Sequence, residues 1–203
     1  MNYMVIAALG YLLGSSSMAY YFSKMKKVDF RAGGSGNLGA SNATVLLGWW
    51  AGILVAAHDI GKSLLAVLLA QWLFPNVENA GAVAGVASVL GHIFPFYLRF
   101  KGGKGFASYF GMTIALNWKL ALIIGLAVVI VTVVTDYIVL GTTITIVTVP
   151  IYLGITQHNL ILSLILCIAT AVIFYKHRMN YVRIFNGTEI GLRSTAKGDH
   201  RVK

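Results

Sequence analysis

The sequence predicts an all-α integral membrane protein that crosses a membrane about seven times. Hydrophobic residues make up 58% of the 203 residues and charged residues only 11%, whereas soluble chains usually carry about 25% charged residues. The apolar residues form runs of membrane-spanning length, and the basic residues gather between those runs, in 24–31, 99–104 and 176–203. Together these observations predict one membrane-embedded domain over residues 1–203.

The first run, at about 3–22, has no lysine or arginine before it and is followed by a basic cluster. A cleavable signal would begin with basic residues, so we expect an uncleaved first helix with its N-terminus outside. Further spans are expected at about 45–74, 80–98, 106–118, 120–134, 140–156 and 160–175. The run at 106–118 is shorter than the roughly 20 residues of an upright span.

Charge placement supports counting that short run as a span. With seven crossings, every basic cluster, including the basic tail 176–203 with the C-terminus, falls on the cytoplasmic side. The turns assigned to the outside, 75–79, 117–119 and 157–159, are almost free of basic residues. The net charge of +10 is therefore explained by membrane topology and anionic headgroups, and no nucleic-acid partner is expected.

Three kinds of residue stand out inside the spans. Asp59 and Lys62 lie three residues apart, and we expect them to pair and stabilise the helix bundle. His92 is as consistent with a buried structural histidine as with a functional one. Small-xxx-small pairs predict close helix packing at Gly10/Gly14, Gly48/Gly52 and Gly81/Gly85.

Two glycine-rich polar loops, 33–42 and 100–105, predict a phosphate site at the cytoplasmic interface. Glycines let consecutive backbone N–H groups point into one anion-binding concavity, and a helix starting near residue 106 adds the positive end of its dipole. We expect catalysis by orientation and electrostatics. The residues that would hold phosphate are Ser35, Gly36, Asn37, Gly39, Asn42, Lys101, Gly102, Gly103, Lys104 and Gly105.

Other phosphate and metal motifs are rejected. The stretch 34–39 matches G-x-G-x-x-G but lacks a βαβ unit, and 61–63 matches the end of a P-loop whose first glycine is replaced by Ala56. No set of cysteines and histidines has the spacing of a metal site, so no metal is expected.

A third group of polar residues opens the tail. His177 and Asn180 would share one helical face if the last span continued inward. Arg178 and Arg183 are as consistent with headgroup contacts as with a site, and Glu189 follows them. We expect the two glycine loops and this tail to converge on one anion pocket.

These segments resemble the bacterial PlsY-type acyl-phosphate:glycerol-3-phosphate acyltransferases. Residues 34–42 fit the family's G-S-G-N-x-G-A-[TS]-N motif, and residues 91–107 fit its G-H-x-F-P-x-x-x-x-F-K-G-G-K-G-x-A motif. The resemblance implies a bacterial plasma-membrane enzyme that forms lysophosphatidic acid from acyl phosphate and glycerol 3-phosphate, without metal or CoA. It implies catalytic roles for Ser35, Lys104, His177 and Asn180, and substrate contacts from Gly36, Asn37, Gly39, Asn42, His92, Lys101, Gly102, Gly103, Gly105, Arg178 and Glu189.

The sequence departs from the family pattern at four positions, which carry Val45, Ser63, Val139 and Gly191. The missing basic and hydroxyl groups would have served the glycerol 3-phosphate half of the site. Two alternatives therefore stand beside the main hypothesis. One is a diverged paralogue with another acyl acceptor, and the other is a membrane protein that binds acyl phosphate or lipid without turnover.

Overall fold

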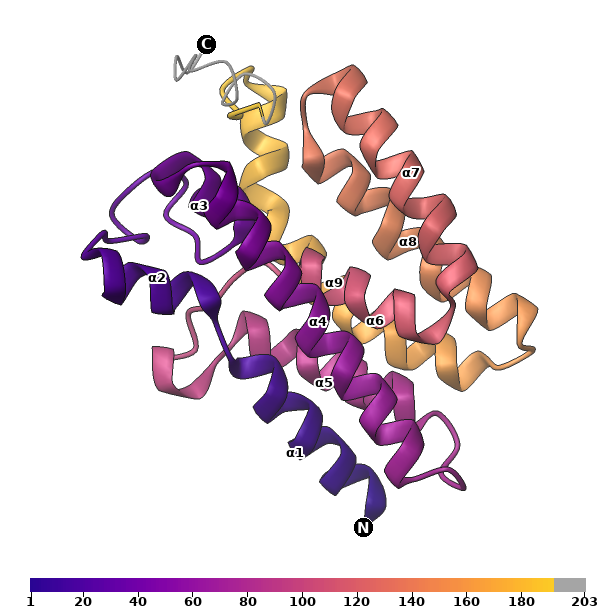
Figure 1. The fold of residues 1–203 in the computed structure, drawn as a ribbon. Coiled ribbons are helices and arrows are strands. Elements are labelled where there is room, and N and C mark those ends of the chain that lie inside the picture. The colour runs from indigo at the N-terminus through magenta and orange to yellow at the C-terminus, as the bar shows by residue number, and fades with distance from the viewer. Residues whose placement is uncertain (192–203) are drawn as a thin grey trace. The chain divides into compact units, whose positions relative to one another are not determined.

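The computed structural model describes residues 1–191. Every regular element in that range is a helix, and no strand occurs there (Figure 1). This confirms the predicted all-α class. The twelve residues 192–203, which include part of the predicted basic tail, lie outside the described residues. The elements are α1 (Asn2–Ser15), α2 (Met18–Lys26), α3 (Ala40–Leu47), α4 (Trp49–Leu73), α5 (Ala80–Ile93), the 3-10 helix η1 (Phe96–Leu98), α6 (Phe106–Leu116), α7 (Trp118–Thr135), α8 (Ile138–Thr156) and α9 (Leu160–Phe185).

Six stretches of the described chain are long and apolar enough to cross a membrane. They are Asn2–Lys26, Trp49–Leu73, Ala80–Leu98, Trp118–Thr135, Ile138–Thr156 and Leu160–Phe185. The run at 106–118 is helical but yields only the 11 residues of α6. At 1.5 Å per residue, a helix of that length extends about 16 Å, roughly half of a bilayer's hydrocarbon core.

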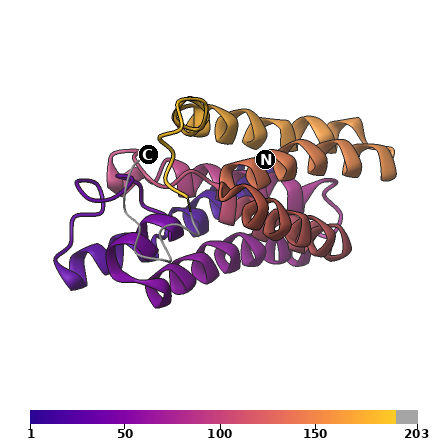
Figure 2. The same cartoon turned by 90° about the horizontal axis from the view of Figure 1, so that it is seen from above.

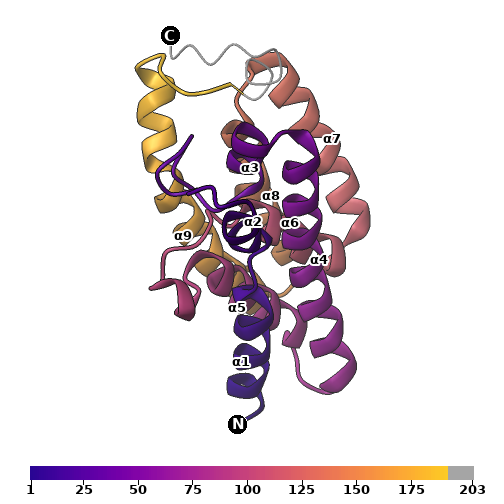
Figure 3. The same ribbon diagram turned by 60° about the vertical axis from the view of Figure 1, so that its left-hand side comes forward.

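The chain divides into two compact units, Met1–Asn117 and Trp118–Lys203. In the first unit, α1 packs on α5, and α4 packs on both α5 and α6 (Figure 3). Gly10 and Gly14 of α1 lie against the backbone of Ala84 and Ser88 of α5, where a Cβ on either glycine would overlap a carbonyl oxygen. The close packing predicted for this glycine pair is confirmed.

Two of the predicted apolar spans are interrupted by breaks that the prediction did not include. The second span begins at Trp49, because Gly48 has a φ of +88° and separates α4 from the short helix α3. Gly48 is therefore a break and not a packing residue, and the prediction for it is wrong. The first run also breaks, at Ser16, after which Ser17 caps α2 by accepting from the Tyr20 N–H, and α2 leaves the direction of α1 (Figures 1 and 3).

The second unit contains α7, α8 and α9, and α8 runs beside α9 (Figure 2). Pro150 within α8 has no N–H, so the Ile146 carbonyl loses its helical partner. The Thr170 hydroxyl of α9 donates to that carbonyl at 2.8 Å, and the Ser163 hydroxyl donates to the Pro150 carbonyl at 2.9 Å. The Thr170 hydroxyl thus satisfies the carbonyl that proline frees, as an apolar surrounding requires, and Ser163 adds a second contact between the two helices.

Candidate active site

Asn42 shapes the first glycine loop from the start of α3. Its side chain is buried, its Oδ1 accepts from the Ser35 N–H at 2.8 Å, and its Nδ2 donates to the Phe30 carbonyl at 2.8 Å. Nδ2 also lies 3.3 Å from the Gly33 carbonyl oxygen. Because both ends of the amide bind loop backbone, Asn42 fixes the conformation of the loop, and the Ser35 residue lies exposed on its surface.

The glycines of this loop allow its tight course. Gly34 and Gly36 have φ values of +58° and +68°, which L-residues with a Cβ rarely adopt. A Cβ on Gly34 would also overlap Asn42 Oδ1. Gly39 is extended and serves as the N-cap of α3, with Asn37 partly buried beside it. The predicted residues of the first loop are thus gathered around one turn.

The second loop folds back onto the end of α5, and this corrects part of the sequence prediction. The Gly102 N–H donates to the Ile93 carbonyl at 3.0 Å, and the Gly103 N–H donates to the His92 carbonyl at 3.1 Å. These two N–H groups do not form the predicted anion concavity, because they pair with the carbonyls that α5 leaves open at its C-terminus. The expectation was wrong because the sequence does not show which backbone groups meet across 92–103.

Candidate anion-binding groups also lie one step further along the chain. Gly105, with a φ of +101°, is the N-cap of α6, and the first-turn N–H groups of a helix have no partner within it. Lys104 precedes this cap directly, and Lys101 is exposed at the tip of the loop. A lysine beside a helix N-terminus combines a full positive charge with the positive end of the helix dipole, which favours phosphate.

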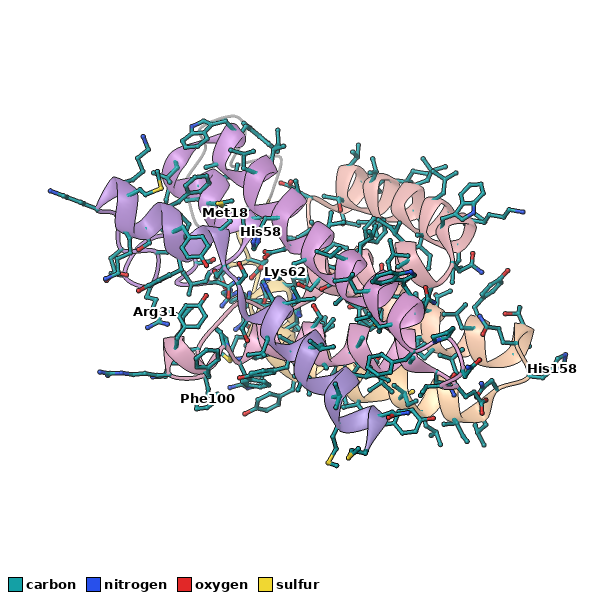
Figure 4. All side chains as sticks on the ribbon, turned by 60° about the horizontal axis from the view of Figure 1, so that its bottom comes forward. Met18, Arg31, His58, Lys62, Phe100 and His158 are labelled. Atoms are coloured by element: carbon teal, nitrogen blue, oxygen red, sulfur yellow. The ribbon has the colours of Figure 1, made fainter. Side chains whose placement is uncertain are left out.

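The two glycine loops meet. A Cβ on Gly103 would lie 2.9 Å from the Leu38 carbonyl oxygen of the first loop, and a Cβ on Gly102 would overlap the His92 carbonyl oxygen. The Arg31 guanidinium adds a second link by donating to the carbonyls of Leu98 at 3.2 Å and Lys101 at 2.9 Å. Figure 4 shows Arg31 and Phe100 on neighbouring segments of this region. The expected proximity of the two loops is confirmed.

A buried polar cluster lies behind the second loop. Lys62 Nζ is 2.7 Å from Asp59 Oδ1, which confirms the predicted pair, and 2.9 Å from His92 Nδ1. It also donates to the Ser16 carbonyl at 2.6 Å, at the bend between α1 and α2. The Ser16 hydroxyl lies 3.0 Å from His58 Nε2, and Figure 4 shows His58 and Lys62 side by side on α4 near Met18. The sequence did not indicate Ser16, although two charges inside an apolar run signalled that further partners were needed.

The predicted residues of the tail lie in the second unit. Helix α9 continues to Phe185, so His177 and Asn180 share one continuous helix, as the prediction required. His177 Nδ1 lies 2.9 Å from the Ile173 carbonyl. Since a carbonyl only accepts, Nδ1 carries a proton, and in a neutral ring Nε2 keeps the lone pair.

Glu189 returns to α9 after the helix ends. The Asn180 amide donates to Glu189 Oε1, and Arg183 Nε donates to Glu189 Oε2 at 2.6 Å. Arg178 points elsewhere, because its guanidinium stacks 4.1 Å from the Tyr175 ring centroid and is exposed. The structure therefore brings Asn180 and Glu189 together within the second unit, and their convergence with the glycine loops stays a prediction.

Comparison with known proteins gives a consistent family. Residues 4–187 match the family model described as glycerol-3-phosphate acyltransferase. A protein of Prochlorococcus marinus (strain MIT 9301) named glycerol-3-phosphate acyltransferase is 36% identical over 202 residues, covering 96% of this chain and 100% of the relative. A protein of the same name from Coxiella burnetii (strain CbuG_Q212) is 38% identical over 191 residues, covering 93% of this chain and 97% of that one.

Two solved structures are similar along nearly the whole chain. Both are of PlsY (YgiH), described as an integral membrane glycerol 3-phosphate acyltransferase. Its glycerol 3-phosphate form matches with a TM-score of 0.87 and 31% identity over 94% of this chain and 96% of that chain. Its lysophosphatidic acid form matches with a TM-score of 0.85 and 30% identity over 97% of this chain and 100% of that chain.

Proposed function

The chain belongs to the glycerol-3-phosphate acyltransferase family, and we propose that it is a membrane enzyme that acylates the sn-1 hydroxyl of glycerol 3-phosphate. The proposed acyl donor is acyl phosphate. The hydroxyl oxygen attacks the acyl carbonyl, the bond from that carbon to the phosphate oxygen breaks, and the hydroxyl proton leaves with the phosphate. The products are lysophosphatidic acid and inorganic phosphate. One observation carries this proposal: the two glycine loops meet beside Lys104 and the start of α6, within the region that matches the family.

Electrostatics supports the assignment of the leaving group. Negative charge grows on the phosphate as the carbon–oxygen bond breaks. Lys104 and the first-turn N–H groups of α6 would stabilise that charge more in the transition state than in the ground state, which accelerates the reaction. We assign Ser35 a hydrogen bond to substrate from the first loop, and we assign Gly36, Asn37 and Gly39 the shape of that loop.

The remaining site residues complete the proposal from the second unit. His177, with its proton on Nδ1, would accept a hydrogen bond through Nε2. Glu189 would orient the Asn180 amide toward substrate. Arg178 would attract the anionic substrates from the surface. The single membrane-embedded domain over residues 1–203 that the sequence predicts stays part of this proposal.

The membrane arrangement is part of the same proposal. We place the protein in the bacterial cell membrane with seven crossings, the N-terminus outside, and the glycine loops and the C-terminus on the cytoplasmic side. The placement of basic residues supports this orientation. It makes α6 a short seventh crossing in addition to the six long apolar stretches.

Local structure shows the surroundings of two of the four departures from the family pattern. The Ser63 hydroxyl lies 2.7 Å from the Ser88 hydroxyl, so both buried groups are satisfied within the helix bundle. At position 191, a Cβ would overlap the Asp136 carboxylate, so a larger residue there would require that side chain to move. Val45 and Val139 have no such structural explanation. We retain glycerol 3-phosphate as the acceptor because residues 4–187 match the glycerol-3-phosphate acyltransferase family.

The first test is product formation by the purified protein. Wild-type protein supplied with acyl phosphate and glycerol 3-phosphate should yield lysophosphatidic acid, detected by mass spectrometry. Lys104→Ala should lower kcat/KM by about 100-fold or more, the size of effect seen when one preorganised oxyanion donor is removed. Lys119→Ala, an exposed lysine outside the glycine loops, is the matched control and should retain wild-type activity.

An acceptor panel in the same assay tests the substrate assignment. Acylation of another hydroxyl compound in place of glycerol 3-phosphate would show a different acceptor. Binding of acyl phosphate with no turnover of any acceptor would contradict the enzymatic proposal.

A further inference from the structure

The buried cluster behind the second glycine loop uses every donor of Lys62. A lysine ammonium has three N–H bonds and no acceptor. Lys62 Nζ has three acceptor atoms around it: the Ser16 carbonyl at 2.6 Å, Asp59 Oδ1 at 2.7 Å and His92 Nδ1 at 2.9 Å. Lys62 therefore ties together the bend after α1, its own helix α4 and the end of α5.

The same contacts determine which nitrogen of His92 carries the proton. Lys62 can only donate, so Nδ1 of His92 must accept. His92 Nδ1 is farther from Asp59 Oδ1, at 3.3 Å, than from Lys62 Nζ, and this also favours acceptance from Lys62. The neutral ring then has its proton on Nε2.

Nε2 of His92 faces the junction of the two glycine loops. A Cβ on Gly103 would overlap His92 Nε2, so the loop backbone passes directly over that edge of the ring. The backbone of His92 also binds this loop, because its carbonyl accepts a hydrogen bond from the Gly103 N–H at 3.1 Å. The orientation of His92 thus sets the position of the segment that leads to Lys104.

We propose that Asp59 and Lys62 are positioning residues for acyl transfer, which act by holding His92 in its Nε2–H form against Gly103. This inference rests on the proposed function, because it names residues that support the same site. It gives the intramembrane charges a role beyond bundle stability. A buried ion pair is weak support for stability, since apolar residues of similar volume often stabilise a protein as well or better.

The kinetic test removes both charges together, so that no unpaired charge stays buried. In the variant Asp59→Asn/Lys62→Met, His92 loses its donor and the loop loses its support. We expect kcat/KM to fall by about 100-fold, the cost typical of a displacement near 1 Å in an active site. Ser63→Ala is the matched control, because it breaks a buried bond between the same two helices without touching His92.

The control separates positioning from stability. The paired variant should unfold at a temperature similar to that of Ser63→Ala while losing far more activity. A loss of activity no greater than that of Ser63→Ala would overturn the proposal.

A double-mutant cycle tests whether the pair acts through His92. His92→Gln can place an amide near the Nε2 position but has no counterpart of Nδ1. If the pair acts through the ring, adding Asp59→Asn/Lys62→Met to His92→Gln should change kcat/KM little. Independent, multiplicative losses would show that the pair does not act through His92.

Nitrogen NMR provides a readout that needs no activity. Full-length protein with ¹⁵N-labelled histidine, held in lipid nanodiscs, should show His92 as the Nε2–H form, assigned by its disappearance in His92→Gln. The paired variant should shift this signal toward the other tautomer or a mixture. An imidazolium or an Nδ1–H ring in the wild-type protein would overturn the inference even if acyl transfer is observed. Absence of acyl transfer with the Nε2–H ring present would instead count against the proposed function alone.

Discussion

Asn42 and Gly102 show how single residues determine the backbone conformation of the glycine loops. The Asn42 amide binds loop groups on both sides, the Ser35 N–H and the Phe30 carbonyl. Gly102 allows the second loop to approach the end of α5 so closely that its N–H reaches the Ile93 carbonyl. Both residues therefore shape the two loops, and Lys104 directly precedes the N-cap of α6 in the sequence.

Gly102→Ala should move the second loop. Its Cβ would overlap the backbone carbonyl of His92, which cannot rotate away as a side chain could. Because Lys104 follows on the same loop, we expect kcat/KM to drop by about 100-fold. The measurement is steady-state acyl transfer by purified protein.

Gly61→Ala on α4 is the control for this substitution, since a Cβ there meets nothing within 4 Å. Equal activity in Gly102→Ala and Gly61→Ala would show that the loop can shift without affecting the site.

At the scale of helices, the contact between α1 and α5 positions the buried polar cluster. The glycines of α1 let the two backbones touch, and the chain then bends at Ser16, whose carbonyl accepts from Lys62. The Tyr97 hydroxyl after α5 donates to the Ser15 carbonyl at 2.8 Å, which fixes the end of α1 a second time. Packing of small residues thus brings α1, α4 and α5 together at the buried polar cluster.

Gly14→Ala should push α1 away from α5, because its Cβ would overlap the Ser88 carbonyl oxygen. Overpacking of this kind costs about 1–3 kcal/mol. We expect a lower midpoint of thermal unfolding in detergent than for Gly61→Ala, which is also a glycine within a helix. A midpoint at or above that of Gly61→Ala would contradict the close packing of these helices.

At the scale of the whole molecule, the number of membrane crossings depends on α6. Its 11 residues fall short of an upright span, while six other stretches are long enough. If α6 crosses, the turn 157–159 lies outside and the end of α9 lies in the cytoplasm. If α6 does not cross, these two positions exchange sides.

Cysteine labelling distinguishes the two topologies. Cys167 is the only cysteine, so Cys167→Ala provides a background for single cysteines at positions 78, 158 and 186. In intact cells, a membrane-impermeant maleimide should label Glu78→Cys and His158→Cys but not Asn186→Cys. Labelling at 186 with none at 158 would show six crossings.

Some helices and loops agree with the prediction from the sequence, and others differ from it. The spans at 120–134, 140–156 and 160–175 correspond to α7, α8 and α9, because long apolar runs have only one backbone solution in lipid. The breaks at Ser16 and Gly48 were missed, since long apolar runs flank both, although three consecutive serines at 15–17 mark the first. The glycine loops were recognised from their residue types, but the partners of the Gly102 and Gly103 N–H groups were not.

The sequence by itself determined that this protein has membrane-spanning apolar runs, a helical class, a family and two glycine-rich loops, to which we assign the chemistry. These depend on composition and local order, which a chain displays without folding. Only the tertiary structure decided that Lys62 binds Ser16 and His92, that Arg31 links the two loops, and that the Gly102 and Gly103 N–H groups pair with the end of α5. Those outcomes depend on which backbone and side-chain groups meet across long sequence distances, and close packing of small residues sets that meeting.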